Sequence, residues 1–191
     1  MTQPLKIAII LSSTREGRFA DKALAWFEPI ARAQEGWEVE VLDLREAALP
    51  FFDEPVPPAA KAPADPAAQA WGARLKGFDG FIVLTAEYNH SITAALKNAF
   101  DHAFEGWAKK PIGAVGYGGV GAARAVEHLR LIAINFGMVP VAAAVAIAGA
   151  DFRALAKGDK SFADLPYLDG SAKALIADME WWGRATKAAR G

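Results

Sequence analysis

Five apolar runs of strand length recur along the chain, and longer segments separate them. The runs lie at residues 5–11, 38–42, 80–84, 112–116 and 139–147. Strands that alternate with helices predict βαβ units, and nearly continuous apolar strands are typical of a parallel sheet covered on both faces. A length of 191 residues leaves no room for a second domain of ordinary size. We therefore predict one α/β domain over residues 1–191.

The segments between the strands differ in how clearly they predict helices. Residues 122–136 carry apolar side chains at the spacing of a helix, and residues 94–104 are a second helical stretch. A first helix should begin near Phe19 and should end or kink at Pro29, because proline disrupts the interior of a helix. The last helix should begin near Ser171, after an irregular loop over residues 150–170.

A proline-dense stretch occupies residues 50–66, which hold six of the eleven prolines. Such a stretch predicts an extended surface loop, not a helix or a central strand. It is either a connector or an arm that covers a pocket or a neighbouring subunit. Phe51, Phe52 and Trp107 are large apolar side chains that one small domain need not cover fully. We therefore expect a homo-oligomer.

Composition excludes several kinds of chemistry and partner. The chain has no cysteine, which excludes disulfides, thiolate catalysis, Cys-ligated zinc and iron–sulfur clusters. A net charge of −1 argues against nucleic acid or an anionic membrane as the main partner. His102 and His128 lie on separate predicted helices, so we predict no metal site. The apolar run at residues 7–11 is too short for a signal-peptide core, and no uncharged stretch reaches the roughly 18 residues of a membrane span. We expect a cytoplasmic protein.

Polar or glycine-rich loops follow three of the predicted strands, where open α/β sheets bind ligands. The first loop contains Ser12, Ser13, Thr14 and Arg15 and precedes a helix. Its N–H groups, hydroxyls and arginine can converge on an anion at the helix N-terminus. The alternative interpretation is a group of helix-capping residues with solvent-facing arginines. The glycine and lysine of a Walker loop are missing, so ATP or GTP hydrolysis is not expected.

The second loop, at residues 87–91, offers an aromatic face from Tyr88 and an amide from Asn89 to a planar heterocycle. The alternative is a polar turn with no ligand, and His90 is expected to be dispensable for chemistry. The third loop matches G-x-G-x-x-G over residues 116–121. It follows the fourth strand, whereas a dinucleotide fingerprint follows the first. These glycines either let the backbone approach a flat ligand or serve tight packing. The three loops together favour a flavin.

At these loops the chain resembles the NADPH-dependent FMN reductase family. That family has approximately G-S-x-R in the first loop and P-E-Y-N-x-S followed by L-K-N after the third strand. The corresponding residues here are 12–15, 86–91 and 96–98, and the resemblance continues through Lys110-Pro111 and residues 116–124. It covers residues 5 to about 147. Ser12 replaces the family's usual glycine and Ala86 its usual proline, while Arg18 and Ala20 stand where serine and asparagine are common.

The resemblance implies a flavodoxin-like three-layer sandwich with five parallel strands in the order 2-1-3-4-5. It implies FMN as the cofactor, NADPH or NADH as the electron donor, and a dimeric or tetrameric assembly. The predicted activity is reduction of flavin, quinone or a similar small acceptor with ping-pong kinetics, in which no side chain acts as a catalytic group because the flavin carries the redox chemistry. The alternatives are an electron carrier of the flavodoxin type, which is usually more acidic than this chain, and a flavin-free binding module.

The predicted cofactor-binding residues come from all three loops. They are Ser12, Ser13, Thr14, Arg15, Arg18, Phe19 and Ala20 in the first, Glu87, Tyr88, Asn89, His90 and Ser91 in the second, and Gly116, Tyr117, Gly118 and Gly119 in the third.

Overall fold

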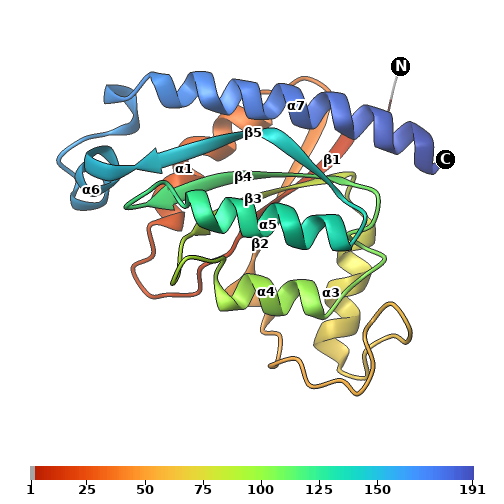
Figure 1. Cartoon of the computed structure of the whole chain (residues 1–191). Helices are drawn as coiled ribbons and strands as arrows, with labels where there is room; N and C mark the ends of the chain where they lie inside the picture. Colours follow the sequence, from red (N-terminus) through yellow and green to blue (C-terminus); the bar gives the residue numbers. More distant parts are fainter. Residues whose placement is uncertain (1–2) are drawn as a thin grey trace.

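A computed structural model describes residues 3–191 and has a five-stranded parallel sheet at its centre (Figure 1). The strand order is β2-β1-β3-β4-β5. The strands are β1 (Leu5–Leu11), β2 (Trp37–Asp43), β3 (Gly80–Ala86), β4 (Pro111–Gly118) and β5 (Val139–Ala148). All neighbouring pairs are parallel. The predicted fold class, strand order and strand positions are confirmed.

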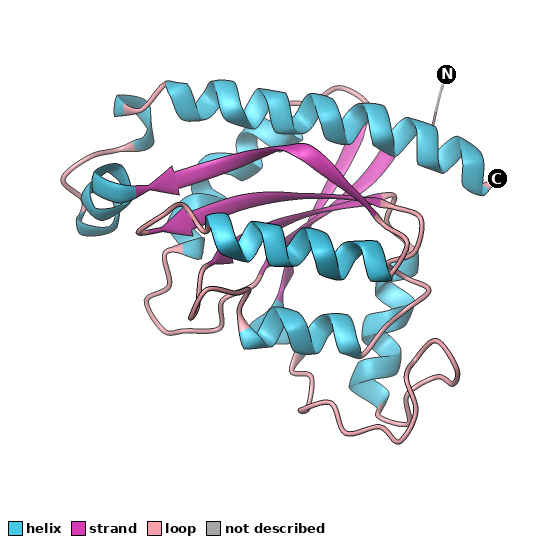
Figure 2. Ribbon diagram, viewed as in Figure 1, coloured by secondary structure: helices cyan, strands magenta, loops and turns pink. Residues whose placement is uncertain are grey.

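Helices cover both faces of the sheet and give the three layers seen in Figure 2. One face packs against α1 (Ala20–Arg32), α6 (Gly149–Lys157) and α7 (Tyr167–Arg190). The other packs against α3 (Pro66–Lys76), α4 (Ala94–Asp101) and α5 (Ala123–Asn135). Two short helical segments, α2 (Leu44–Ala47) and η1 (Phe162–Asp164), complete the chain. No helix within residues 3–191 combines the length and apolar character that crossing a membrane requires.

Alternation along the central strands explains why their sequences are almost entirely apolar. In β1, Ile7 and Ile9 belong to the core on the α1 and α7 side, whereas Ala8 and Ile10 belong to the core on the α3, α4 and α5 side. Successive side chains of a strand point to opposite faces, so a sheet with two covered faces needs apolar residues at every position. This confirms the expected burial on both faces for the central strands β1, β3 and β4. The edge strands β2 and β5 are only partly buried and leave side chains such as Glu38 exposed.

The prediction of an irregular loop over residues 150–170 is wrong. Residues 149–157 form α6, and α7 begins at Tyr167 instead of near Ser171. The physical reason is tertiary. Phe152 lies 5.0 Å from Phe19, measured between ring centroids, and Leu155 is 3% exposed. These two contacts anchor α6 to the core, and Gly158 ends it with a left-handed conformation, φ 89°.

Of the two outcomes expected at Pro29, an end or a kink of the first helix, the end does not occur. The helix α1 continues through Pro29 to Arg32. Phe27 and Ala31, on either side of the proline, are fully buried against the sheet. Their burial holds the last turn in place despite the backbone hydrogen bond that proline cannot donate.

The proline-rich segment is an extended surface loop from residue 48 to residue 65, as predicted, and Pro66 opens α3. Figure 1 shows it extending beyond α3 and α4. The α4 helix holds the start of this loop. Asn98 Nδ2 donates to the Pro50 carbonyl at 2.8 Å, and Asn98 Oδ1 accepts from the Phe52 N–H at 2.9 Å. Phe51 remains 84% exposed, but Trp107 is fully buried, so it cannot be one of the uncovered side chains.

Candidate functional site

Side chains from different loops meet at the carboxyl edge of the sheet. The Ser13 Oγ of the first loop and the Tyr88 hydroxyl of the second are hydrogen-bonded at 2.9 Å. Glu87 of the second loop accepts from Arg124 Nε, at the start of α5, at 2.6 Å. The strand pairing that aligns Ala86 with Tyr117 brings these loops side by side. All three predicted loops therefore border one region.

In the first loop, backbone carbonyl groups have hydrogen-bond partners whereas most backbone N–H groups do not. The carbonyl groups of Ser12 and Ser13 accept from Thr93 Oγ1 and Arg18 Nη1, both at 2.7 Å. In contrast, the N–H groups of residues 13–17 donate no hydrogen bond to another group of the described chain. Ser12 Oγ is buried and has no hydrogen-bond partner among the residues that the structure describes. Unpaired N–H groups just before a helix form a site for an anion such as a phosphate.

Arg18 lies inside the fold with its guanidinium group fully engaged. Its side chain is 4% exposed and donates to Asp43 at 2.7 and 2.5 Å and to Asp21 at 2.8 Å. The hydrogen bond to Asp43 raises the pKa of Arg18 above its ordinary value. Burial opposes ionisation of Asp43, but the hydrogen bonds from Arg18 and from the Arg45 N–H prevail and lower the pKa of that carboxyl. Arg18 thus supports the loop from within, while Arg15 is exposed.

The second loop is a tight turn. Tyr88 and Ser91 exchange two backbone hydrogen bonds, of 2.9 and 3.0 Å. Asn89 and His90, the two central residues, have φ of 50° and 69°. Positive φ at both positions is the signature of a type I′ turn, which asparagine tolerates well. The turn exposes Asn89 and His90, and Arg15 of the first loop lies 6.0 Å from the Tyr88 ring centroid.

Glycines of the third loop divide into two groups. A Cβ at Gly116 would lie 2.5 Å from the Gly121 carbonyl oxygen, so Gly116 is required by packing. A Cβ at Gly118 or Gly119 would have no described atom within 4 Å. Tyr117 points into the core and is 3% exposed, 5.1 Å from Phe19 between ring centroids. Burial raises the pKa of its hydroxyl above the ordinary value. Only Gly118 and Gly119 therefore leave open space for a flat ligand.

The structure thus separates the predicted residues into two sets. Those at the open edge are Thr14, Arg15, Asn89, His90, Gly118 and Gly119, with Ser13, Glu87, Tyr88 and Ser91 beside them. Those that support the edge from the interior are Ser12, Arg18, Phe19, Ala20, Gly116 and Tyr117. No group of three His, Asp or Glu side chains suited to a metal ion occurs in the part of the chain that the structure describes.

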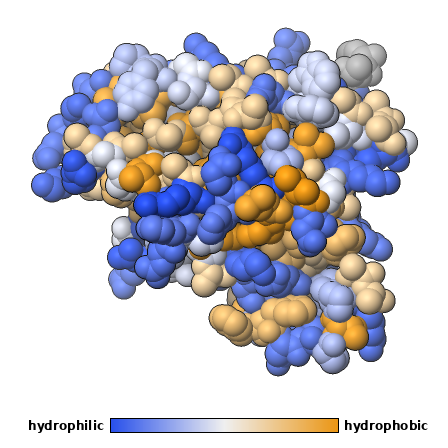
Figure 3. Space-filling model, viewed as in Figure 1, coloured by the Kyte–Doolittle hydropathy of each residue, from blue (hydrophilic) through white to orange (hydrophobic). Residues whose placement is uncertain are grey.

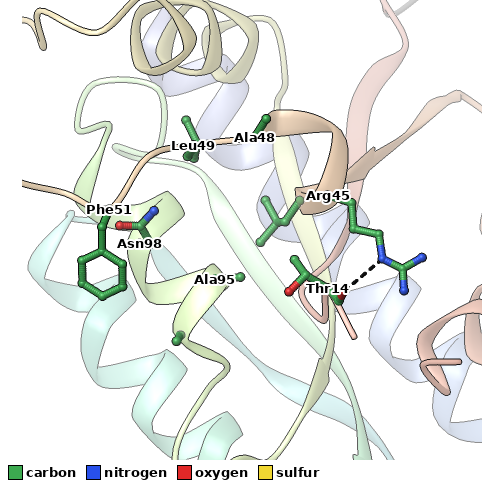
Figure 4. Close-up of a pocket in the computed structure, with 9 residues that line it drawn as sticks. Thr14, Arg45, Ala48, Leu49, Phe51, Ala95 and Asn98 are labelled. Atoms are coloured by element: carbon green, nitrogen blue, oxygen red, sulfur yellow. Dashed lines mark hydrogen bonds between the residues drawn. The ribbon is translucent and has the colours of Figure 1, made fainter. Parts of the chain in front are cut away.

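Sequence reasoning missed Arg45, which follows β2. Arg45 Nε donates to the Thr14 carbonyl at 3.2 Å, and Arg45 Nη2 donates to the Arg15 carbonyl. Figure 4 shows Arg45 beside Thr14 at one end of a cavity of about 430 Å³. The residues that line this cavity are Thr14, Leu44, Arg45, Ala48, Leu49, Phe51, Ala94, Ala95 and Asn98. The predicted strand order could have pointed to Arg45, because it places the end of the second strand next to the first loop.

Comparison with known proteins identifies the family. The family model for NADPH-dependent FMN reductase matches residues 5–152. The chain belongs to the NADPH-dependent FMN reductase family. The resemblance seen in the loop motifs is therefore confirmed, and the match extends a few residues further than the motifs did.

Relatives named as reductases are about a third identical to this chain over the aligned residues. An NAD(P)H-dependent FMN reductase of Schizosaccharomyces pombe is 32% identical over 130 residues, 67% of this chain and 65% of that protein. A quinone reductase of Escherichia coli K12 is 31% identical over 140 residues, 70% of this chain and 72% of that protein. The aligned part of the chain thus spans somewhat less than two thirds of the yeast relative.

Solved structures of other proteins have a similar fold. The flavoenzyme NAD(P)H:(acceptor) oxidoreductase of Paracoccus denitrificans has a TM-score of 0.66 and 22% identity, covering 92% of this chain and 97% of that chain. A flavodoxin of Pseudomonas aeruginosa has a TM-score of 0.52 and 18% identity, covering 90% and 99%. At these identities the likeness concerns the fold alone, which is flavodoxin-like as expected.

Proposed function

We propose that this protein is an FMN-dependent oxidoreductase that takes hydride from NADPH or NADH and reduces flavin, quinone or a similar small acceptor. Relatives described as FMN reductases and quinone reductases support this proposal. The observation that carries it is the arrangement of the carboxyl edge, where unpaired N–H groups in the first loop and open space at Gly118 and Gly119 lie on either side of the Glu87–Ser91 turn. That arrangement fits a ligand with an anionic end and a flat end.

The residues fit FMN in the following way. The N–H groups of residues 13–17 and the Arg15 guanidinium would hold the phosphate. The Glu87–Ser91 turn and the Gly118–Gly119 backbone would bracket the ring, and the bond from Ser13 fixes the Tyr88 hydroxyl beside it. When bound, the flavin accepts and passes on hydride. The side chains of this protein bind and orient, and none is required as a nucleophile or proton donor.

Flavin reduction tests the proposed class directly. Protein reconstituted with FMN should lose the absorbance of oxidised flavin near its visible maximum when NADPH or NADH is added without oxygen. Subsequent addition of a quinone should restore the absorbance of the oxidised flavin. If neither nucleotide bleaches the bound flavin, the electron-carrier interpretation replaces ours. If FMN does not bind at all, the interpretation as a flavin-free binding module replaces ours.

Steady-state kinetics test whether donor and acceptor share one place on the flavin. Among the described residues of the third loop, Gly118 and Gly119 border open space in which a substrate could stack on the flavin. If the oxidised nicotinamide must leave before the acceptor enters, the mechanism is ping-pong. Double-reciprocal plots of rate against NADPH, at several fixed quinone concentrations, should then be parallel. Intersecting lines would mean that both substrates bind together, and the shared site would be rejected.

We also propose a homo-oligomer, a dimer or a tetramer. Figure 3 shows apolar side chains gathered over α5, a helix on which Leu131 is 67% and Ile134 is 62% exposed. Phe51 is 84% exposed at the start of the proline-rich loop. Exposed apolar patches of this kind often mark protein interfaces. Light scattering at micromolar concentration should report at least twice the 20.3 kDa mass of the chain, and a stable monomer would contradict the proposal.

The place of action that we propose is the cytoplasm, where reduced nicotinamide nucleotides are available as donors. A chain without cysteine is compatible with this reducing compartment.

A further inference from the structure

Side-chain donors occupy four successive backbone carbonyls of the first loop. Ser12, Ser13, Thr14 and Arg15 each contribute a carbonyl oxygen that accepts one such bond. The donors are Thr93, Arg18 and, for the last two carbonyls, Arg45. The N–H groups of residues 13–17 in the same loop have no protein partner within residues 3–191. The loop is therefore polarised: the carbonyls of residues 12–15 are occupied, and the N–H groups of residues 13–17 are available.

Asp43 links the two arginines that produce this polarity. Its carboxylate accepts both Arg18 bonds and also accepts from the Arg45 backbone N–H at 2.9 Å. The pairing of β1 with β2 places Asp43 opposite Leu11, one residue before the loop begins. Asp43 thus caps the first turn of α2 and sets the position from which Arg45 reaches back to the loop.

Carbonyl oxygens repel a phosphate, whereas N–H groups attract it. A flexible loop presents both, so its affinity for phosphate depends on which set faces the ligand. We propose that Arg45, set in place by Asp43, is a positioning residue: by holding the Thr14 and Arg15 carbonyls it orients the N–H groups of the same two peptide planes, those of Arg15 and Glu16, toward the phosphate of FMN. This inference rests on the proposed function, because it assigns the flavin phosphate to the first loop.

The geometry distinguishes positioning from simple charge attraction. Arg45 places Nε and Nη2 on two successive carbonyls (Figure 4 draws the bond to Thr14). Two donors in one planar group hold two adjacent peptides, a function that requires the arginine fork. A lysine at this position would keep the positive charge near the loop but could not hold both carbonyls in this geometry. Arg45→Lys and Arg45→Met therefore separate the two roles.

The test measures dissociation constants for FMN and for riboflavin, which lacks the phosphate, by fluorescence titration of the full-length chain. Arg45→Met should weaken FMN binding about tenfold, the value that one charge-assisted hydrogen bond provides, and leave riboflavin binding within about twofold. Arg45→Lys should behave like Arg45→Met. Asp43→Asn should lower the preference for FMN in the same direction.

Arg32→Met is the matched control, because Arg32 is another exposed arginine that donates to a backbone carbonyl, that of Val39, at 2.8 Å. It should leave both constants unchanged. The inference is overturned if Arg45→Lys retains full FMN affinity, since charge alone then suffices. It is also overturned if Arg45→Met weakens both flavins equally, as a general structural defect would, or changes neither.

Failure of this inference can be told apart from failure of the proposed function. If the unaltered protein binds FMN no more tightly than riboflavin, the first loop does not bind the phosphate, and both proposals lose that site. If the unaltered protein prefers FMN and Arg45→Met keeps the full preference, only the role of Arg45 is rejected.

Discussion

Replacing Trp107 with alanine is expected to lower the free energy of unfolding by about 3–5 kcal/mol, the range for removing a large aromatic side chain from a core. Trp107 is fully buried on the face of the sheet covered by α3, α4 and α5. Its ring centroid lies 4.7 Å from those of Phe81 and Phe100 and 5.9 Å from that of Trp71. The substitution would leave a cavity among rings that cannot collapse together. Urea denaturation followed by circular dichroism measures the effect.

Two further variants check the cause. Trp107→Phe should cost about 1 kcal/mol or less, because most of the ring contacts remain and an indole N–H without a described partner is removed. Trp181→Ala deletes the same side chain where it is 64% exposed and should change stability by about 0.5 kcal/mol or less. Equal losses for Trp107→Ala and Trp181→Ala would contradict the burial of Trp107.

Local sequence predicted the sheet well because the central strands β1, β3 and β4 are buried along nearly their whole length and therefore read as apolar runs. Residues 5–11 were predicted and observed with the same bounds, and β2 is longer than predicted by one residue at each end. The wrong predictions concern features that depend on distant partners. Phe152 anchors α6 through Phe19, and Trp107 is covered by rings from α3, β3 and α4. No local pattern reports such contacts.

The position of the candidate site in the fold follows from strand order, whereas the direction in which its side chains point does not. Loops after β1, β3 and β4 were identified from their residue types and their places in the chain. That Arg18 faces Asp43 while Arg15 faces solvent does not follow from two arginines in one loop. Arg45 was missed because its partners, the carbonyls of Thr14 and Arg15, lie about 30 residues away and are part of the backbone.

Replacing Gly119 with leucine is expected to weaken flavin binding strongly while leaving the fold intact. Gly119 does not have the positive φ that would strain a larger residue, and no described atom lies within 4 Å of where its Cβ would be. Its carbonyl accepts from the Gly149 N–H at 3.1 Å, a backbone bond that leucine can keep. The new side chain would then extend into the space assigned to the flavin ring. Overpacking costs about 1–3 kcal/mol, so FMN affinity should fall by roughly tenfold to a hundredfold.

Two other glycines separate filling of the site from damage to the fold. Gly170→Leu lies on α7, where a Cβ also has no described neighbour within 4 Å. It should leave flavin affinity unchanged and raise stability by about 0.5–1 kcal/mol, because leucine favours the helix more than glycine does. Gly116→Ala should lower stability, because its Cβ would lie 2.5 Å from the Gly121 carbonyl oxygen. Calorimetric titration with FMN and urea denaturation of each variant measure the two effects independently. A Gly119→Leu protein that binds FMN with unchanged affinity would place the ring elsewhere, and the cavity beside Arg45 and Phe51 would become the next candidate.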